Sequence, residues 1–511
     1  MKNIFIFALV FLHVSCKEFL DVKPVGRLIP SQVEDFENIL NSSTTLDYHF
    51  FDNNRGSSYA FLGDNFTISD NQARFLYVST HPNIDRYAAF TFYRPYLDPN
   101  KPQYTWEWGI YSAVGLFNTV ISGVAELKAT ETELGKTVVA QAKAGRAWSY
   151  MVATMGYGPI YDPNGDNSAK VLPFRVSADP SSANPQLSTT RELFDLIEED
   201  LQAALDAPAQ VSNPSRADKT AVYGLRAMFY MYKRDWAAVV QNANEAWELA
   251  IAQKGGPDGL IYDYNTFSYN VRTGASPPPG VDVEVSSELV GPDQNLQQTY
   301  HRENLFYRIA PQGTEAYPSD DFLDNFDKEN DRRYQLFALK SLGYNTKQGV
   351  NTYSDGVVIK YYKGAKMNIN QGLTYPELIL MRAEANARLN NLPEALADIN
   401  LLRKYRYSGN NRELANGTEL NQDQLLQEIL NERRRELPIE SFQRTFDIKR
   451  LALDTGKPWC KSTVVHRIGD REYTAPVNNE FFSLPISNII IQFNPQWGLP
   501  LDNRPYLPKD Q

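Results

Sequence analysis

The sequence has very few of the residues that most often build metal and disulfide sites. It contains two cysteines, Cys16 and Cys460, and five histidines among 511 residues. Two cysteines are too few for a disulfide scaffold or for a zinc site made of cysteine ligands. The HExxH, GxGxxG, Walker-type and GxSxG motifs do not occur, and these motifs carry common catalytic chemistries. We therefore expect a protein that is not an enzyme and that holds no metal and no cofactor.

Positive charge is scarce relative to negative charge. Lysine and arginine number 51 and aspartate and glutamate 61, which gives a net charge of −10 and a pI near 5.3. Nucleic-acid binding needs a basic surface, so this balance argues against nucleic acid as a partner. The excess is in aromatic residues, with 30 tyrosines, 26 phenylalanines and 7 tryptophans.

Long hydrophobic runs are also missing, apart from Ile4–Leu12 near the start of the chain. This run is too short to cross a bilayer, which takes about 20 residues. Lys2 precedes the run and Val14-Ser15-Cys16 follows it, which is the order of a secretory signal peptide that ends in a bacterial lipobox. We predict a signal peptide over residues 1–15 and a lipid on Cys16, and no transmembrane helix elsewhere.

Hydrophobic residues at spacings of three and four predict a mainly α-helical chain. Very short connections, such as Arg234-Asp235, predict antiparallel helical hairpins within about 105–252 and 374–453. Small residues in these helices are typical of tetratricopeptide-like units. The predicted helices cover residues 106–127, 137–155, 189–205, 219–233, 235–252, 375–389, 393–406, 423–437 and 439–453.

Two local signals predict how helices begin. Thr189 and Glu192 have the spacing of a capping box. Ser31 is expected to cap a short helix over 33–40. The regions of about 41–100 and 255–370 show no helical period, so we expect irregular, aromatic-rich insertions there.

The run Glu432-Arg433-Arg434-Arg435-Glu436 is interpreted as structural. Glu432 lies three residues before Arg435, and Arg433 three before Glu436, so each pair can meet on the helix surface. The tryptophans on helical patterns are read as core residues; they are Trp106, Trp108, Trp148 and Trp236.

The C-terminal third carries a series of fragments in a specific order. They are Tyr-Pro-Glu at 375–377, Met-Arg-Ala-Glu-Ala at 381–385, Glu-Ala-Leu-Ala-Asp-Ile-Asn at 394–400, Ile-Leu-Asn-Glu-Arg-Arg-Arg-Glu-Leu at 429–437 and Phe-Ser-Leu-Pro-Ile at 482–486. Together with a lipobox followed by Glu-Phe-Leu-Asp at 18–21, this series resembles the SusD/RagB family of Bacteroidetes outer-membrane lipoproteins. The resemblance covers nearly the whole chain.

The resemblance implies a SusD-like fold, in which four tetratricopeptide-like helical hairpins support a loop-rich, ligand-binding half. It implies a lipidated tether over 16–30 and a single domain over 31–511. It also implies a lipid-anchored protein that faces the cell exterior, binds a nutrient oligosaccharide or polysaccharide, and delivers it as a hinged lid to a SusC-type TonB-dependent transporter.

Sugar rings present apolar faces and outward hydroxyls, so a glycan site needs aromatic rings beside polar side chains. Residues 69–96 and 262–307 have this composition. The candidate ligand-binding residues are Asp70, Asn71, Tyr77, Arg86, Tyr93, Arg94, Tyr269 and Tyr300.

Two alternatives stay open at this point. The first is a peptide-binding member of the same architecture, in which backbone hydrogen bonds replace ring stacking. The second is a secreted tetratricopeptide-type scaffold without a small ligand.

Overall fold

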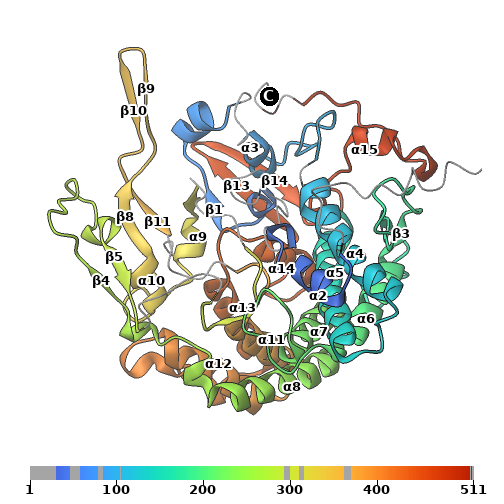
Figure 1. Ribbon diagram of the computed structural model, residues 1–511. Coiled ribbons are helices and arrows are strands. Elements are labelled where there is room, and N and C mark those ends of the chain that lie inside the picture. The colour runs from blue at the N-terminus through green and yellow to red at the C-terminus, as the bar shows by residue number, and fades with distance from the viewer. Residues whose placement is uncertain are drawn as a thin grey trace, which may run out of the picture.

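The computed structural model describes residues 30–45, 58–78, 84–103, 105–292, 300–309, 316–361, 370–506 and 508. Helices form the lower and right-hand part of the molecule in Figure 1, whereas short strands and loops form much of the upper left. The fold is therefore mainly α-helical, as predicted. The predicted signal peptide and all but the last residue of the predicted tether, residues 1–29 with Cys16, lie outside the described residues.

Each predicted helix has a counterpart among the described helices. The described helices are α2 (Val33–Ile39), α3 (Ile84–Phe90), α4 (Ser112–Glu126), α5 (Glu133–Tyr157), α6 (Thr190–Ala203), α7 (Lys219–Lys233), α8 (Trp236–Lys254), α9 (Asp320–Leu323), α10 (Arg332–Phe337), α11 (Tyr375–Arg388), α12 (Leu392–Arg406), α13 (Gln422–Glu436), α14 (Gln443–Leu451) and α15 (Asn488–Gln492). Helix α4 begins six residues later than predicted, and α3, α9, α10 and α15 were not predicted. Helices α7 and α8 pack as a hairpin, as do α11 and α12, and α11 packs on both α8 and α13.

Side-chain caps begin several of these helices. The capping box is confirmed: Thr189 Oγ1 accepts from the Glu192 N–H at 3.2 Å, and Glu192 Oε2 accepts from the Thr189 N–H at 2.7 Å. The prediction for Ser31 is wrong. Gln32 occupies the N-cap position of α2, because the Asp35 carboxylate reaches back to the N–H groups of both Ser31 and Gln32.

The two regions predicted to be irregular contain regular structure. The first contains α3 and the π-helical turn η4 (Gln72–Leu76), and the second contains short helices and hairpins. The strands in these regions escaped prediction because two to five residues show too little of the two-residue period. The strands are β1 (Phe66–Thr67), β2 (Lys170–Leu172), β3 (Ser188–Thr189), β4 (Ser268–Asn270), β5 (Glu288–Val290), β6 (Asn304–Phe306), β7 (Tyr317–Pro318), β8 (Ala338–Leu342), β9 (Asn345–Gln348), β10 (Asn351–Ser354), β11 (Val357–Tyr361), β12 (Leu373–Thr374), β13 (Thr463–Ile468) and β14 (Arg471–Pro476).

One long ribbon crosses the loop-rich side. Strand β8 pairs antiparallel with β11, and β9 pairs antiparallel with β10. The Gly343 N–H donates to Gly356 O and the Asp355 N–H donates to Tyr344 O, which joins the two ladders. The outer part, β9–β10, projects from the top of the molecule (Figure 1).

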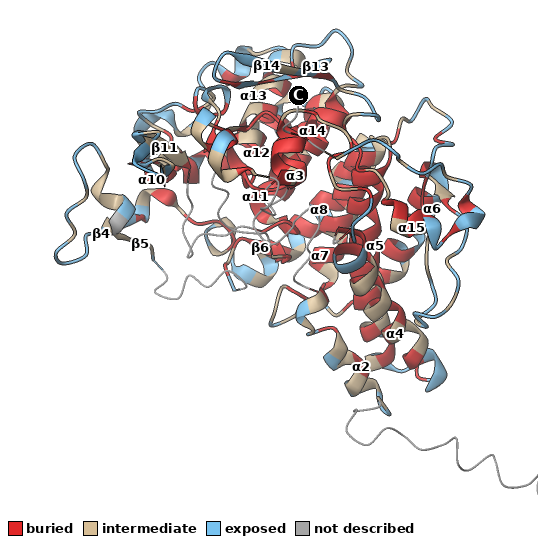
Figure 2. Cartoon of the chain, turned by 90° about the horizontal axis from the view of Figure 1, so that it is seen from above, coloured by how far each residue is buried: buried red, intermediate tan, exposed pale blue. Residues whose placement is uncertain are grey.

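Buried residues concentrate in the helices, whereas the projecting hairpins are largely exposed (Figure 2). Residues Thr105–Glu126 have the length and apolarity of a membrane span, and half of the most apolar window is buried inside the protein. The segment comprises the π-helical η5 (Thr105–Tyr111) and α4, and α4 packs on α5 and α2. It is therefore placed as a core element of the helical half.

The tryptophan prediction holds in part. Trp106 and Trp148 are buried, and Trp236 is half-buried. Trp108 is 55% exposed, so its assignment to the core is wrong. In η5 the buried positions are Thr105, Trp106, Gly109 and Ile110, which leaves Trp108 on the solvent side of the turn.

Candidate functional site

The acidic and basic residues of α13 form part of a buried ionic network. Arg333 pairs with Asp331 at 2.7 Å, Glu432 at 2.5 Å and Glu436 at 2.9 Å. Arg406 pairs with Glu436 and Glu303, both at 2.8 Å. Arg333 and Arg406 are fully buried, so each guanidinium compensates carboxylates that are also removed from water.

This network corrects the predicted pairing along α13. Glu432 does contact Arg435, at 2.8 Å, but Arg433 binds Glu377 at 3.0 Å and Asp447 at 2.9 Å instead of Glu436. The helix face involved is buried and not on the surface. The reason is that partners from α11 and α14 lie closer to Arg433 than the residue one turn along its own helix.

The network determines the charge of its carboxyl groups. Burial opposes ionisation of Glu432, but Arg333 and Arg435 outweigh burial and lower its pKa. Burial raises the pKa of Glu303 and of Glu377 despite their arginine partners. The paired charges of this network therefore hold α10 to α14 together. A ligand that displaced one of the carboxylates would leave a buried arginine unpaired.

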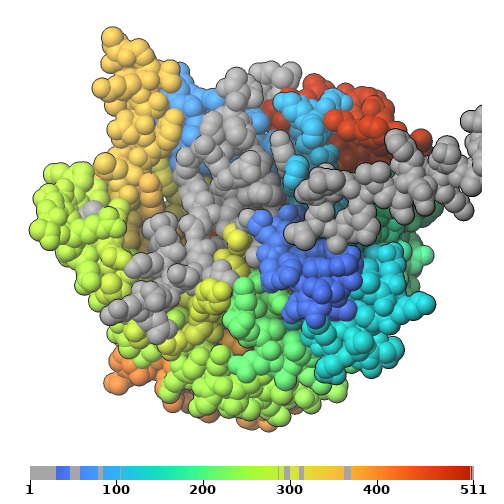
Figure 3. Space-filling model, in the orientation of Figure 1, coloured from blue at the N-terminus to red at the C-terminus, as the bar shows by residue number. Residues whose placement is uncertain are grey.

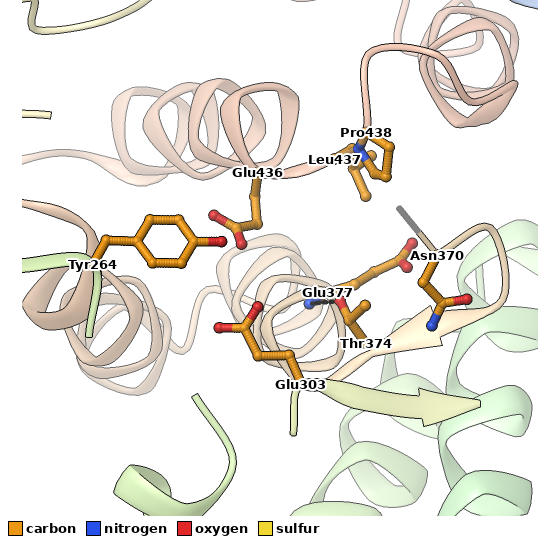
Figure 4. Close-up of a pocket in the computed structure, with 8 residues that line it drawn as sticks. All are labelled: Tyr264, Glu303, Asn370, Thr374, Glu377, Glu436, Leu437 and Pro438. Atoms are coloured by element: carbon orange, nitrogen blue, oxygen red, sulfur yellow. Dashed lines mark hydrogen bonds between the residues drawn. The ribbon is translucent and has the colours of Figure 1, made fainter. Parts of the chain in front are cut away.

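A small cavity lies inside this network (Figure 4). Its volume is about 20 Å³, which suffices for one water molecule and not for a sugar ring. The side chains of Glu303, Glu436 and Tyr264 point toward the same space. The lining residues are Tyr264, Glu303, Asn370, Thr374, Glu377, Glu436, Leu437 and Pro438. The cavity belongs to the structural core.

A second group of polar side chains gathers at the surface, around Asp355 at the base of the β9–β10 hairpin. The Ser69 hydroxyl donates to Asp355 Oδ2 at 2.6 Å, and Asn71 Nδ2 donates to Asp355 Oδ1 at 2.8 Å. The Tyr317 hydroxyl, from β7, also donates to Oδ2 at 2.6 Å. Burial and this carboxylate raise the pKa of Tyr317, so its hydroxyl stays a donor. Asp355 therefore fastens the hairpin to the 69–77 segment.

Beside this junction, two aromatic rings meet across the same segments. The ring centroids of Phe75 and Tyr353 are 4.6 Å apart at an interplanar angle of 43°. The guanidinium of Arg74 lies 5.2 Å from the Phe75 centroid and 5.7 Å from the Tyr353 centroid. Both rings are half-buried and Arg74 is exposed. Phe75 lies in the π-helical turn η4, a geometry often found at functional sites.

An exposed charged pair involves Asp70, which lies next to Asn71 in the same segment. Arg471, in β14, donates to Asp70 Oδ1 at 3.2 Å, and the two side chains are 54% and 65% exposed. We call the whole group the Phe75–Tyr353 site, and it comprises Asp70, Asn71, Arg74, Phe75, Tyr353, Asp355 and Arg471. It offers apolar ring surface beside amide, carboxylate and guanidinium groups, which is the combination that binds sugars.

The structure brings two of the candidate residues, Asp70 and Asn71, into this site. Tyr77 and Arg86 are buried; both pack near Phe61, so we do not retain them as ligand contacts. Their selection rested on residue type, which does not reveal the direction of a side chain.

The other candidates lie apart from the Phe75–Tyr353 contact. The Tyr93 hydroxyl donates to Pro505 O at 3.0 Å, and the half-buried Arg94 lies 5.9 Å from the Tyr96 ring. The Tyr269 hydroxyl donates to Leu336 O at 2.5 Å. Tyr300 is 60% exposed.

Sequence reasoning missed Arg74, Phe75, Tyr353, Asp355 and Arg471. Arg74 and Phe75 lie inside a segment that was selected for its composition, so the segment was right and the choice of residues incomplete. Tyr353 lies beyond the second selected segment, and no local pattern indicates that it meets Phe75. Among the described residues, no group of three or more His, Cys, Asp or Glu is arranged to hold a metal ion.

Two family models match consecutive parts of the sequence. The model described as the SusD family matches residues 262–495. The model described as starch-binding associating with outer membrane matches residues 18–231. A SusD-like protein of Bacteroides ovatus is 26% identical over 241 residues, which are 46% of this chain and 40% of that relative. The match thus spans less than half the length of the relative.

Solved structures share the fold over almost the whole chain. A SusD superfamily protein of Bacteroides thetaiotaomicron has a TM-score of 0.63 at 15% identity and covers 91% of this chain and 98% of its own. A SusD-like carbohydrate binding protein of Bacteroides vulgatus has a TM-score of 0.59 at 16% identity, with 91% and 97% covered. For surface glycan-binding protein A of Bacteroides uniformis the values are 0.58, 14%, 91% and 98%.

These matches define the class of the protein. The chain belongs to the SusD/RagB family, and the solved structures share its mainly α-helical SusD-like fold. The predictions of the family and of the fold class are confirmed. Membership also associates the chain with the outer membrane, which the description of the second family model names.

Proposed function

We propose that this protein binds a glycan at the cell surface and that the Phe75–Tyr353 site is its contact surface. The observation that carries the proposal is the pair of half-buried rings, 4.6 Å apart, beside exposed hydrogen-bonding side chains. Rings placed in this way can cover the apolar face of a sugar while Asp70, Asn71 and Arg74 bond its hydroxyls. Support comes from the family description as starch-binding and from the named glycan- and carbohydrate-binding proteins of the same fold.

The anchoring and the partner are part of the same proposal. Cys16 carries a lipid that tethers the domain of residues 31–511 to the outer membrane, and the domain faces outward. A SusC-type TonB-dependent transporter receives the glycan beneath the hinged protein. Replacing Cys16 with Ala should release the protein from the membrane fraction, and a native complex should contain the transporter on purification.

Peptide binding is the second candidate and the scaffold without a ligand the third. The fold relatives named above are described by carbohydrate or glycan binding, which favours the glycan. Peptide that co-purifies with the native complex, with no response to any glycan, would reverse this order.

The direct test measures binding to a polysaccharide panel by affinity electrophoresis and calorimetry. Phe75→Ala and Tyr353→Ala should each weaken binding about 3- to 10-fold, because a ring contact contributes roughly 0.5–1.5 kcal/mol. Phe493→Ala is the matched control, since Phe493 is 82% exposed and is not part of the site. A native protein that binds no glycan, or variants that bind as well as the native chain, would overturn the proposal.

A further inference from the structure

The β9–β10 hairpin stands away from the rest of the molecule. In Figure 1 it rises above the body, and in Figure 3 it forms the yellow projection at the upper left. Gln348 pairs with Asn351, so Gly349 and Val350 form a two-residue turn. Gly349 has a φ of 63°, which suits the first position of such a turn. Val350, at the tip, is 100% exposed.

The hairpin presents two faces of different chemistry. Tyr353 lies opposite Thr346, and Asn351 lies opposite Gln348; alternate residues of a strand share a face, so these side chains form one face, which we call the Tyr353 face. The opposite face comprises Asn345, Lys347, Thr352 and Ser354. The Tyr353 face carries amide and hydroxyl groups and no charge, whereas the opposite face contains the lysine.

The Tyr353 face continues the Phe75–Tyr353 site. Tyr353 belongs to both, because its ring packs on Phe75, and Asp355 holds the hairpin base to Ser69 and Asn71. A strand rises about 3.4 Å per residue, so the face extends the site by roughly 10 Å from Tyr353 toward the tip.

We infer that the Tyr353 face is an outer subsite that binds a neutral glycan chain beyond the aromatic rings and makes affinity depend on chain length. This inference rests on the proposed function. Amide and hydroxyl side chains match the many hydroxyl groups of an uncharged sugar chain. A protein partner would instead call for Trp, Tyr or Arg anchors in a desolvated patch, and the outer part of this face, formed by Thr346, Gln348 and Asn351, has none of these.

The test compares two cross-strand pairs at neighbouring positions of the same hairpin. Gln348→Ala with Asn351→Ala removes the outer end of the Tyr353 face, and Lys347→Ala with Thr352→Ala alters the opposite face. Calorimetry would use neutral oligosaccharides of increasing length, cut from a polysaccharide that the native protein binds. The first variant should lose about 5- to 10-fold affinity for long chains and keep its affinity for the shortest ligand. The second should match the native protein throughout.

Equal behaviour of the two variants, or a loss that does not depend on length, would overturn the inference. Unchanged affinity together with loss of transporter co-purification, or of self-association in light scattering, would assign the hairpin to a protein partner or to a second copy instead. Failure of the proposed function is distinguishable, because Phe75→Ala and Tyr353→Ala would then leave binding unchanged as well. Lys347, Gln348, Asn351 and Thr352 are exposed, so thermal unfolding of both hairpin variants should match that of the native chain.

Discussion

The ionic network of α10 to α14 and the Phe75–Tyr353 site use the same residue types at opposite levels of exposure. Arg333, Glu432 and Arg406 are buried, with their charges paired inside the helical half. At the surface, Arg74 is exposed and Asp70 and Arg471 are more than half exposed. Buried paired charges hold helices together, whereas exposed charges beside half-buried rings remain accessible to a ligand.

This difference also separates family recognition from function. The charged run at 429–437 makes the resemblance to the family recognisable, yet its buried arginines contact other parts of the fold: Arg433 binds Glu377 and Asp447, and Arg435 donates to Asn325 O. The residues proposed to bind glycan belong to segments without such a motif. A strong motif in this protein therefore reports on architecture, and the ligand must be sought where side chains remain accessible.

The largest expected effect comes from breaking the buried network. Arg406→Met should lower the free energy of unfolding by about 3–5 kcal/mol, because Glu303 would stay buried without the guanidinium that pairs with it and Glu436 would keep only Arg333. Urea unfolding measures the change, and Arg74→Met, at an exposed arginine, should cost less than about 1 kcal/mol. Equal costs for the two variants would refute the distinction between the regions.

An intermediate effect is expected at Asp218, a buried carboxylate that is held by backbone groups. Its carboxylate caps α7 by accepting from the Ala221 N–H at 2.8 Å, and burial raises the pKa of Asp218 to about 6. The folded state then binds the proton more tightly than the unfolded state, so the stability that the protonated form provides below about pH 4 is lost as the pH rises through about 6. Asn keeps the cap without the charge.

Asp218→Asn should therefore be more stable than the native chain by roughly 1–3 kcal/mol at pH 8 and nearly equal to it at pH 4. Urea unfolding at both pH values measures this. The outcome that would contradict this prediction is a stability difference between variant and native chain that is the same at pH 4 and pH 8. It would mean that ionisation of the buried Asp218 carboxyl does not destabilise the fold.

The smallest effect on stability is expected for the exposed pair at the site. Asp70→Ala should change the free energy of unfolding by less than about 1 kcal/mol, because exposed ion pairs contribute little. Glycan affinity should fall about 3- to 10-fold, since one hydrogen bond contributes about 1 kcal/mol. Asp423→Ala is the matched control, because Asp423 and Lys457 form an ion pair that is similarly exposed, at 46% and 45%. An equal effect of both variants on affinity would contradict a role for Asp70.

Local patterns predicted the helical half well. The helices that became α7, α8, α11 and α12 follow from the spacing of apolar residues, and the capping box at Thr189 forms as expected. These features depend on residues within about one turn of each other, which a single sequence reveals. The same reasoning was wrong for Arg433 because its partners Glu377 and Asp447 come from other helices.

The candidate site was predictable only as a region. Composition pointed to the segment of residues 69–96 and correctly included Asp70 and Asn71, but it could not separate the buried Tyr77 from the half-buried Phe75. A π-helical turn decides that difference, and its geometry depends on packing against the rest of the fold.

The sequence by itself determined the signal-like N-terminus, the helical hairpins and the family, because each depends on short-range order along the chain. Only the tertiary structure decided which arginines are buried and which aromatic rings stay partly exposed. It also joined Phe75 to Tyr353 through the contacts of Asp355 with Ser69, Asn71 and Tyr317. The physical reason is that burial and long-range hydrogen bonds depend on how distant segments pack, and no local period of the sequence encodes that packing.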